Sequence, residues 1–177
     1  MVSLTVVFWM YVILFAIIGG MRGWARELLV SFSVILALTF TTLLENYVPF
    51  IRDVLKPDSP VLYFWLRFMI IVLLVFFGYQ TPNIPRFAAK MSREKIQDVL
   101  LGIFIGALNG YLIVGTLWFY MYEANYPFAV IAPPEIGSQV ERIANAMLQY
   151  MPPKILGIPG IYFAVVVAFI FVIVVFI

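Results

Sequence analysis

Apolar residues along this chain gather into five long runs, separated by short connectors that are rich in polar residues or proline. A helix of roughly 20 apolar residues is long enough to cross the hydrocarbon core of a bilayer. The pattern therefore predicts an all-α integral membrane protein, folded as a single membrane domain over residues 1–177. The expected transmembrane spans are 2–20, 28–44, 61–79, 99–122 and 160–177.

The segment between the fourth and fifth runs has a different pattern. Ser138 and Glu141 have the spacing of a capping box, which marks the start of a helix. Apolar residues follow at helical intervals until two adjacent prolines end the pattern. This favours an amphipathic interfacial helix over residues 138–151, lying on the outer surface with its apolar side in the bilayer. The same face could equally dock a partner protein.

The fourth run carries the most specific pattern, three glycines at four-residue intervals. Gly102, Gly106 and Gly110 fall along one face of a helix. Such a face lets a second helix approach closely in lipid, where no hydrophobic force drives helices together. Asp98 comes directly before this run, and we expect it to cap the helix at the positive end of its dipole or to form an ion pair. We interpret the stretch 98–110 as a helix-packing seam.

A short polar connector joins the first two runs and forces them into an antiparallel hairpin. Its candidate residues are Arg22, Gly23, Trp24, Arg26 and Glu27. Glycine allows the turn, tryptophan suits the headgroup region, and the arginines mark the cytoplasmic side. We interpret the charges as topology signals with a local ion pair. The sharper alternative is a site for a lipid headgroup or a partner.

Arg67 is an intramembrane charge in the third run, roughly 11 Å past Pro60 at the rise of an α-helix. A charge at this depth is a functional candidate by default. The simpler interpretations are that it snorkels to the outer interface or pairs with Glu45 or Glu123, both expected at the same level.

The amino-acid composition limits the kinds of chemical site that the chain can contain. The chain is 64% hydrophobic and 11% charged, with a mean hydropathy of +1.06, which is more apolar surface than a soluble domain can bury. It contains neither cysteine nor histidine, so disulfides, Cys- or His-based zinc sites, histidine-ligated haem or pigment, and Ser-His or Cys-His pairs are excluded. We therefore expect no enzyme and no cofactor. Contact with lipid, quinone or pigment would need packing without histidine ligation.

One arrangement could still support a membrane enzyme. Asp98, Glu27 and Arg22 are expected near the cytoplasmic interface, where two carboxylates could hold a metal ion. Helix capping and an ion pair explain the same residues more simply. The net charge of +2 is too small to indicate nucleic-acid binding.

The distribution of basic residues predicts an orientation. Six lie on one side of the predicted membrane: Arg22, Arg26, Arg86, Lys90, Arg93 and Lys95. Four lie on the other side: Arg52, Lys56, Arg142 and Lys154. Because basic residues favour the cytoplasmic side, the N-terminus is expected outside and the C-terminus inside.

Two stretches together resemble the colicin V production protein (CvpA) family of small bacterial inner-membrane proteins. Residues 20–27 are similar to its arginine–glycine–aromatic hairpin, and residues 98–110 are similar to its aspartate followed by three spaced glycines. The four-span layout also fits, so the resemblance covers roughly residues 1–151, with the fifth span as an addition. The chain departs from the family pattern at Thr5, where members often carry an aspartate, and at Val99 and Asn109, which are often basic.

The resemblance implies a place in the bacterial inner membrane and a link to colicin V production or envelope physiology, with no agreed biochemical activity. The first hypothesis is a structural or accessory subunit that packs against a larger membrane assembly, such as a respiratory or photosynthetic complex. The alternative is an oligomeric channel or transporter component, with Arg67, Glu45, Glu123 and Asn109 along a polar path. The expected partners are the lipid bilayer and either other membrane subunits or further copies of the chain.

Overall fold

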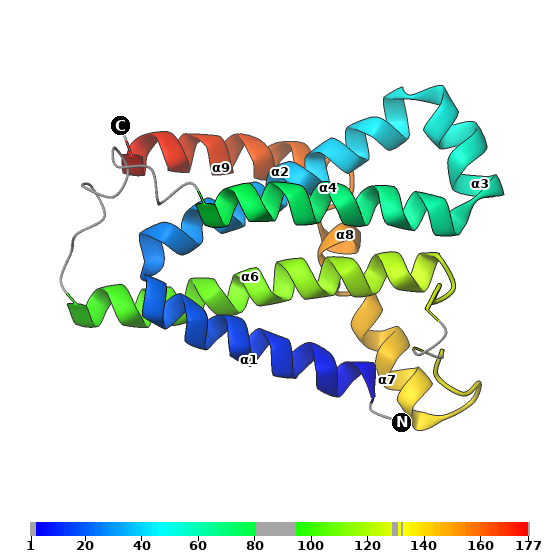
Figure 1. Ribbon diagram of the computed structural model, residues 1–177, viewed down its shortest axis with the longest axis horizontal. Helices are drawn as coiled ribbons and strands as arrows, with labels where there is room; N and C mark the ends of the chain where they lie inside the picture. The colour runs from blue at the N-terminus through cyan, green and yellow to red at the C-terminus, as the bar shows by residue number, and fades with distance from the viewer. Residues whose placement is uncertain (1–2, 81–94, 129–130, 132, 177) are drawn as a thin grey trace.

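The computed structural model of the chain describes residues 3–80, 95–128, 131 and 133–176 (Figure 1). Every regular element in these ranges is helical, which confirms the predicted all-α membrane class. Four helices are long and apolar enough to span a bilayer: α1 (Leu4–Arg22), α2 (Trp24–Tyr47), α4 (Pro60–Gln80) and α6 (Lys95–Glu123). A fifth apolar helix, α9 (Gly160–Phe176), is shorter. The basic connector at 81–94, with Arg86, Lys90 and Arg93, lies outside the described residues.

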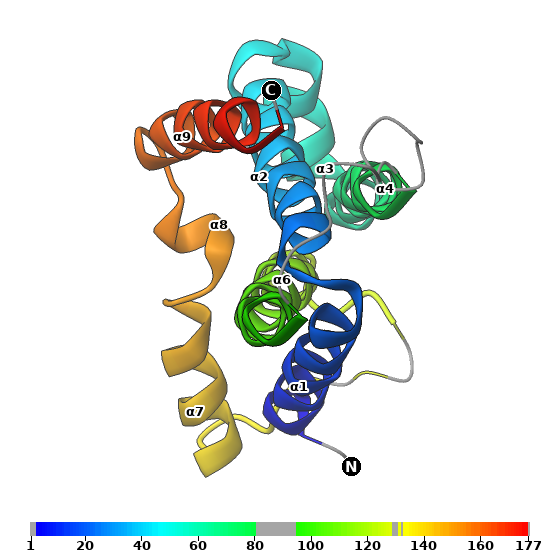
Figure 2. The ribbon, with the colours of Figure 1, turned by 90° about the vertical axis from the view of Figure 1, so that its left-hand side faces the viewer.

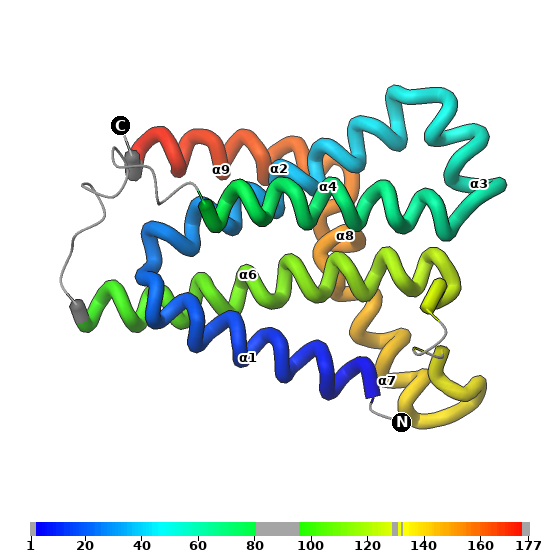
Figure 3. The backbone as a smooth tube through the Cα atoms, viewed as in Figure 1, coloured from blue at the N-terminus to red at the C-terminus, as the bar shows by residue number. Residues whose placement is uncertain are grey.

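The long helices are arranged around α6. Helix α1 packs against one side of it and α2 against the other, while α4 and α9 flank α2 on opposite sides (Figure 2). Helix α1 begins and α9 ends at opposite ends of the bundle (Figure 3).

Two apolar clusters hold this arrangement together. The larger one joins α2, α4 and α6, with Val34, Phe64, Ile71 and Leu112 among its buried members. The second cluster joins α1 and α6 to the segment that follows them. Its buried members include Phe8, Val12, Trp118, Ala144, Leu148 and Met151.

The helix ends differ from the predicted spans because interfacial polar residues continue the helices. Helix α2 begins at Trp24 instead of residue 28, directly after the turn at Gly23, whose φ of 87° favours glycine. Helix α6 begins at Lys95, before Asp98. The polar connector between α2 and α4 forms a π-helical segment, η1 (Phe50–Leu55), and a single turn, α3 (Lys56–Asp58).

The predicted amphipathic helix is present as α7 (Gln139–Leu148), and its first turn is capped as expected. The Glu141 backbone N–H donates to Ser138 Oγ at 3.1 Å, and Glu141 Oε2 accepts from the Gly137 N–H. The helix is shorter than predicted, because a separate turn, α8 (Pro152–Ile155), follows it.

Helices α7 and α8 pack against the rest of the bundle through some of their residues, and their other side chains are exposed. Met151 and Pro152 are buried, and both touch the backbone at Gly115 of α6. Gly115 lies about 12 Å from Glu123, the last residue of α6, at the rise of an α-helix. At α8 the chain therefore lies well inward of the last residue of α6, and α9 begins shortly after it.

Candidate functional site

The glycine seam of α6 is occupied within the chain by α1. A Cβ placed on Gly106 would lie 2.8 Å from Gly19 Cα, and one on Gly110 would lie 3.0 Å from Val12 Cα. A Cβ placed on Gly102 would approach the carbonyl oxygen of Gly19 more closely still. Two backbones approach this closely only where side chains are absent. The seam thus packs against α1, with Gly19 opposite Gly102 and Gly106 and Val12 opposite Gly110.

Asp98 lies in the first turn of α6, but the helix start that its carboxylate caps is that of α2, whereas the sequence led us to expect a cap on α6. Its Oδ1 accepts a hydrogen bond at 3.1 Å from the backbone N–H of Trp24, the first residue of α2. A Cβ on Gly23 would lie 2.7 Å from the same oxygen, so glycine serves both the turn and the carboxylate. The negative charge also lies at the positive end of the α2 dipole.

We expect Asp98→Ala to lower the free energy of unfolding by about 1 kcal/mol, the usual value of a helix cap. Asp98→Asn should lose less, because the amide oxygen still accepts from Trp24. Thermal unfolding of the purified protein in detergent measures both, with Gln97→Ala on the exposed neighbour as a matched control. Equal stability of all three variants would contradict the capping role.

A polar cluster beside the α1–α2 turn joins all four long helices, and we call it the inner cluster. Glu27 is 0% exposed, and its Oε1 accepts from Arg22 Nη1 at 2.7 Å. Asn109 Nδ2 donates to Glu27 Oε2 at 2.8 Å and to the Glu27 carbonyl at 2.9 Å, while Ser31 Oγ donates to Asn109 Oδ1 at 2.6 Å. The Arg22 guanidinium also stacks over the ring of Tyr79 at 4.2 Å and donates to its carbonyl. Both oxygens of the buried Glu27 carboxylate therefore accept a hydrogen bond.

Sequence reasoning placed only part of this cluster. It expected a local ion pair among Arg22, Arg26 and Glu27 without choosing the partners, whereas in the structure Glu27 is buried, pairs with Arg22 and bonds across to α6. Arg26 is exposed on the other side of the turn. Asn109 was expected only along the polar path of the channel alternative, and its contacts with Glu27 and Ser31 were not predicted. The available signal was that Asn109 is the only side-chain amide in the run 99–122.

A second polar cluster, at the opposite ends of these helices, surrounds Arg67, and we call it the outer cluster. Arg67 is 5% exposed and does not snorkel. Its Nη1 donates to Glu123 Oε2 at 2.5 Å, and its guanidinium lies between the rings of Tyr63 and Tyr120, 4.0 and 3.9 Å from their centroids. Glu45 is not the partner of Arg67. It accepts instead from the Tyr63 hydroxyl at 3.0 Å and forms an ion pair with Lys56. Of the alternatives from the sequence, the pair with Glu123 is the one that forms.

We expect Arg67→Leu to lower the free energy of unfolding by about 2 to 3 kcal/mol, because it removes a buried charge pair and two cation–π contacts. Denaturation in mixed micelles measures this. Arg52→Leu is the matched control, since Arg52 pairs with Asp53 on an exposed connector, and it should leave stability unchanged. An Arg67→Leu variant as stable as the parent would contradict the buried pair.

The inner and outer polar clusters are separated by apolar side chains. Between them lie Val34 and Leu38 of α2, Ile71 of α4, and Leu112 and Ile113 of α6, all buried. Thr116, at the same level, donates its hydroxyl back to the Leu112 carbonyl. Within the described residues, the bundle therefore contains an apolar layer between two polar ends.

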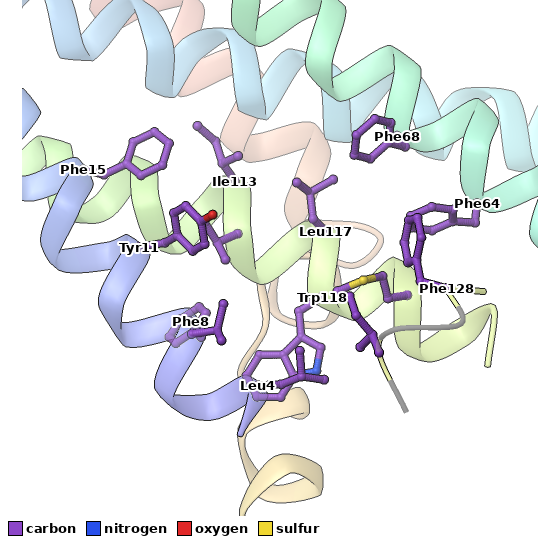
Figure 4. A pocket seen from close by; sticks show the side chains of 14 residues that line it. Leu4, Phe8, Tyr11, Phe15, Phe64, Phe68, Ile113, Leu117, Trp118 and Phe128 are labelled. Atoms are coloured by element: carbon purple, nitrogen blue, oxygen red, sulfur yellow. The ribbon is translucent and has the colours of Figure 1, made fainter. Parts of the chain in front are cut away.

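An apolar groove of about 480 Å³ runs along α6 where α1 and α4 diverge. Figure 4 shows Phe8, Tyr11 and Phe15 from α1 and Phe64 and Phe68 from α4 on either side of Leu117 and Trp118. Such a lining suits hydrocarbon.

The two carboxylates considered for a metal site have different partners. Asp98 serves the α2 backbone, and Glu27 serves Arg22 and Asn109. In the described parts of the chain, the acidic residues form no group of three or more that could hold a metal ion.

One comparison with known proteins is informative. The model of a family described as colicin V production protein matches residues 4–133, which is more than half of the chain. Neither the curated proteins nor the solved structures gave a match.

Proposed function

The chain belongs to the colicin V production protein family, and from that starting point we propose a role without chemistry of its own. In this proposal the protein is a multi-pass inner-membrane subunit that packs against a larger membrane assembly. Its own N-terminus lies outside and its C-terminus inside, and it carries no cofactor.

The observation that carries the proposal is how the charged side chains in and near the ends of the spans are paired. Arg22 and Glu27 pair with each other, and so do Arg67 and Glu123. Charged groups in a membrane are costly, and they usually mark a substrate path unless they pair. Here both pairs are satisfied within the chain and join its helices. This use of charge favours a structural role over a catalytic one.

The lipid-facing surfaces are where a partner would bind. Large apolar side chains are exposed along α4 and α9, including Phe76 and Phe77 on α4 and Phe163 on α9. Aromatic rings are favoured at interfaces because they bury much area with little loss of conformational freedom. We propose that at least one of these faces contacts another membrane protein.

Photo-crosslinking in native membranes tests this proposal. A photoreactive phenylalanine analogue would replace Phe77, Phe104 or Phe163, all exposed, and Phe64, which is 1% exposed, would serve as the matched control. The expected result is a cross-linked product of defined mass with a different membrane protein from at least one exposed position, and none from Phe64. Products with lipid or with the same chain alone would contradict the proposal.

A channel or transporter component, acting in export or envelope homeostasis, is the second candidate. It is favoured by a polar cavity of about 180 Å³ beside Arg67, which Glu45 and Glu123 also line. The apolar layer at Val34, Leu38 and Ile113 opposes it, and so does the occupation of the glycine seam by α1, since that seam would have joined several copies. Solute flux in reconstituted vesicles that depends on Arg67 would support this candidate.

A further inference from the structure

The apolar groove between α1 and α4, which we call the α1–α4 groove, is lined by an unusual number of rings. Seven of the described residues that line it are aromatic. Where α1 meets α6, the ring centroids of Phe8 and Trp118 lie 5.8 Å apart. On the α4 side, the Phe64 centroid lies 5.6 Å from that of Phe128 and 5.9 Å from that of Phe68. Because these rings pack on one another, the groove presents fixed ring surfaces to a ligand (Figure 4).

A second groove of nearly the same size provides a comparison. It lies between α2 and α4, has a volume of about 460 Å³ against about 480 Å³, and we call it the α2–α4 groove. Among the described residues that line it, Phe40 is the single aromatic one, and no side chain carries nitrogen or oxygen. Acyl chains of bulk lipid need only apolar walls, so they would fill both grooves alike. The additional rings of the α1–α4 groove favour a ligand that itself contains a ring.

The α1–α4 groove also contains hydrogen-bond donors that lack acceptors. Tyr11 and Trp118 are the only described residues of its lining whose side chains carry nitrogen or oxygen, and none of these residues is charged. The Tyr11 hydroxyl forms no hydrogen bond with a described residue, and neither does the buried Trp118 Nε1. An unpaired polar group in apolar surroundings is costly, and an acceptor from a ligand would remove that cost. The lining therefore suits a neutral ligand that brings a carbonyl oxygen.

The depth of Tyr11 in the membrane excludes the carbonyls of ordinary phospholipids. At the rise of an α-helix, Tyr11 lies roughly 10 Å from Leu4 and roughly 16 Å from Arg22, the two ends of α1. A phospholipid at this depth offers only its acyl chains, because its ester groups lie in the interfacial region. The Tyr11 side chain extends from α1 toward α6 and is 41% exposed, so the groove is open to the bilayer beside it (Figure 4). The ligand must therefore dissolve in hydrocarbon together with its carbonyl group.

We propose that the α1–α4 groove binds an isoprenoid quinone. The planar ring lies between the aromatic walls, one of its carbonyls accepts from the Tyr11 hydroxyl, and the isoprenoid tail follows the groove along α6. The volume of the groove is within the range of about 300 to 1,000 Å³ that is usual for small-molecule sites. Because the quinone enters and leaves through the bilayer, it is an exchanging ligand and not a resident cofactor. This inference goes beyond the proposed subunit role and does not depend on it, because a chain that works alone could bind the quinone equally well.

Binding to the purified full chain in detergent is measured by quenching of tryptophan fluorescence with a short-tailed ubiquinone or menaquinone, since Trp118 lines the groove. Tyr11→Phe removes one hydroxyl and keeps the ring. We expect it to weaken binding roughly two- to tenfold, the usual net effect of one neutral hydrogen bond. Tyr150→Phe, at an exposed position on the outer surface, is the matched control and should leave binding unchanged. Equal affinities of Tyr11→Phe and the parent would overturn the assigned hydrogen bond, and no saturable quenching with either quinone would overturn the site.

Photo-crosslinking distinguishes a quinone site from filling by bulk lipid. A quinone that carries an azide on its ring should label α1 and leave α2 unlabelled, whereas a phospholipid with a photoreactive acyl chain should label both grooves. Leu117→Trp fills the α1–α4 groove and should abolish labelling by the quinone, and Leu73→Trp in the α2–α4 groove should not. Equal labelling of the two grooves by the azidoquinone would overturn the proposal. If Leu117→Trp does not fold, reduced labelling of Tyr11→Phe provides the same readout.

Discussion

Replacing Glu27 with leucine is expected to lower the free energy of unfolding by about 3 to 4 kcal/mol, the usual effect of removing one partner from a buried charge pair. The substitution leaves the Arg22 guanidinium without its carboxylate and removes one of the two hydrogen bonds that Asn109 Nδ2 donates. Because the cluster joins all four long helices, the loss should appear as unfolding of the whole bundle. Denaturation in mixed detergent micelles, followed by circular dichroism, measures it.

The matched control for Glu27→Leu removes both charges. In Arg22→Met with Glu27→Leu, no unpaired ion remains, and apolar side chains of similar volume fill the site, so we expect most of the stability to return. Glu27→Gln should fall between the two, because its amide oxygen still accepts from Asn109. If the double variant were less stable than Glu27→Leu, the pair would not be the source of the effect.

Replacing Gly106 with leucine should prevent normal packing of α1 on α6, with a loss of about 3 kcal/mol or more, at the upper end of what overpacking costs. Even a Cβ at this position would lie 2.8 Å from Gly19 Cα, and it would also meet the Phe15 carbonyl. These neighbours are backbone atoms, which cannot rotate away as a side chain can. Loss of the folded form during detergent extraction is the measurement.

Two other positions on α6 control for the size of the new side chain. Phe104→Leu changes an exposed, lipid-facing position and should leave the folded form intact during detergent extraction. At Gly115, an added Cβ would meet the Met151 sulfur at 2.9 Å and Pro152 Cδ, and a methionine side chain can shift, so Gly115→Ala should cost less than Gly106→Ala. A fully folded Gly106→Leu variant would show that α1 and α6 do not meet at this seam.

Much of the fold could be predicted because a bilayer imposes length and hydropathy on its helices. The apolar runs gave the positions of α1, α2, α4, α6 and α9, and the spacing of Ser138 and Glu141 located the start of α7. Helix ends were less accurate, because residues such as Trp24 and Lys95 continue a helix into the interface, where hydropathy no longer distinguishes helix from loop.

The candidate site was harder to predict, because pairing across helices depends on three-dimensional register. The seam glycines could be identified from their spacing, but their partner Gly19 could not, since a small residue at the end of an apolar run resembles a helix stop. For Arg67, helical rise placed Glu45 and Glu123 equally near. The choice of Glu123 depends on the tyrosine rings that orient the guanidinium, and the burial of Glu27 depends on Asn109 lying opposite it.

The most direct test of the proposed subunit role is purification of the tagged protein from native membranes in a mild detergent, with determination of the mass and composition of the particle. We predict a larger particle that contains a different membrane protein in fixed stoichiometry. A particle that contains only this chain, whether single or in several copies, would contradict the subunit role and favour the channel alternative.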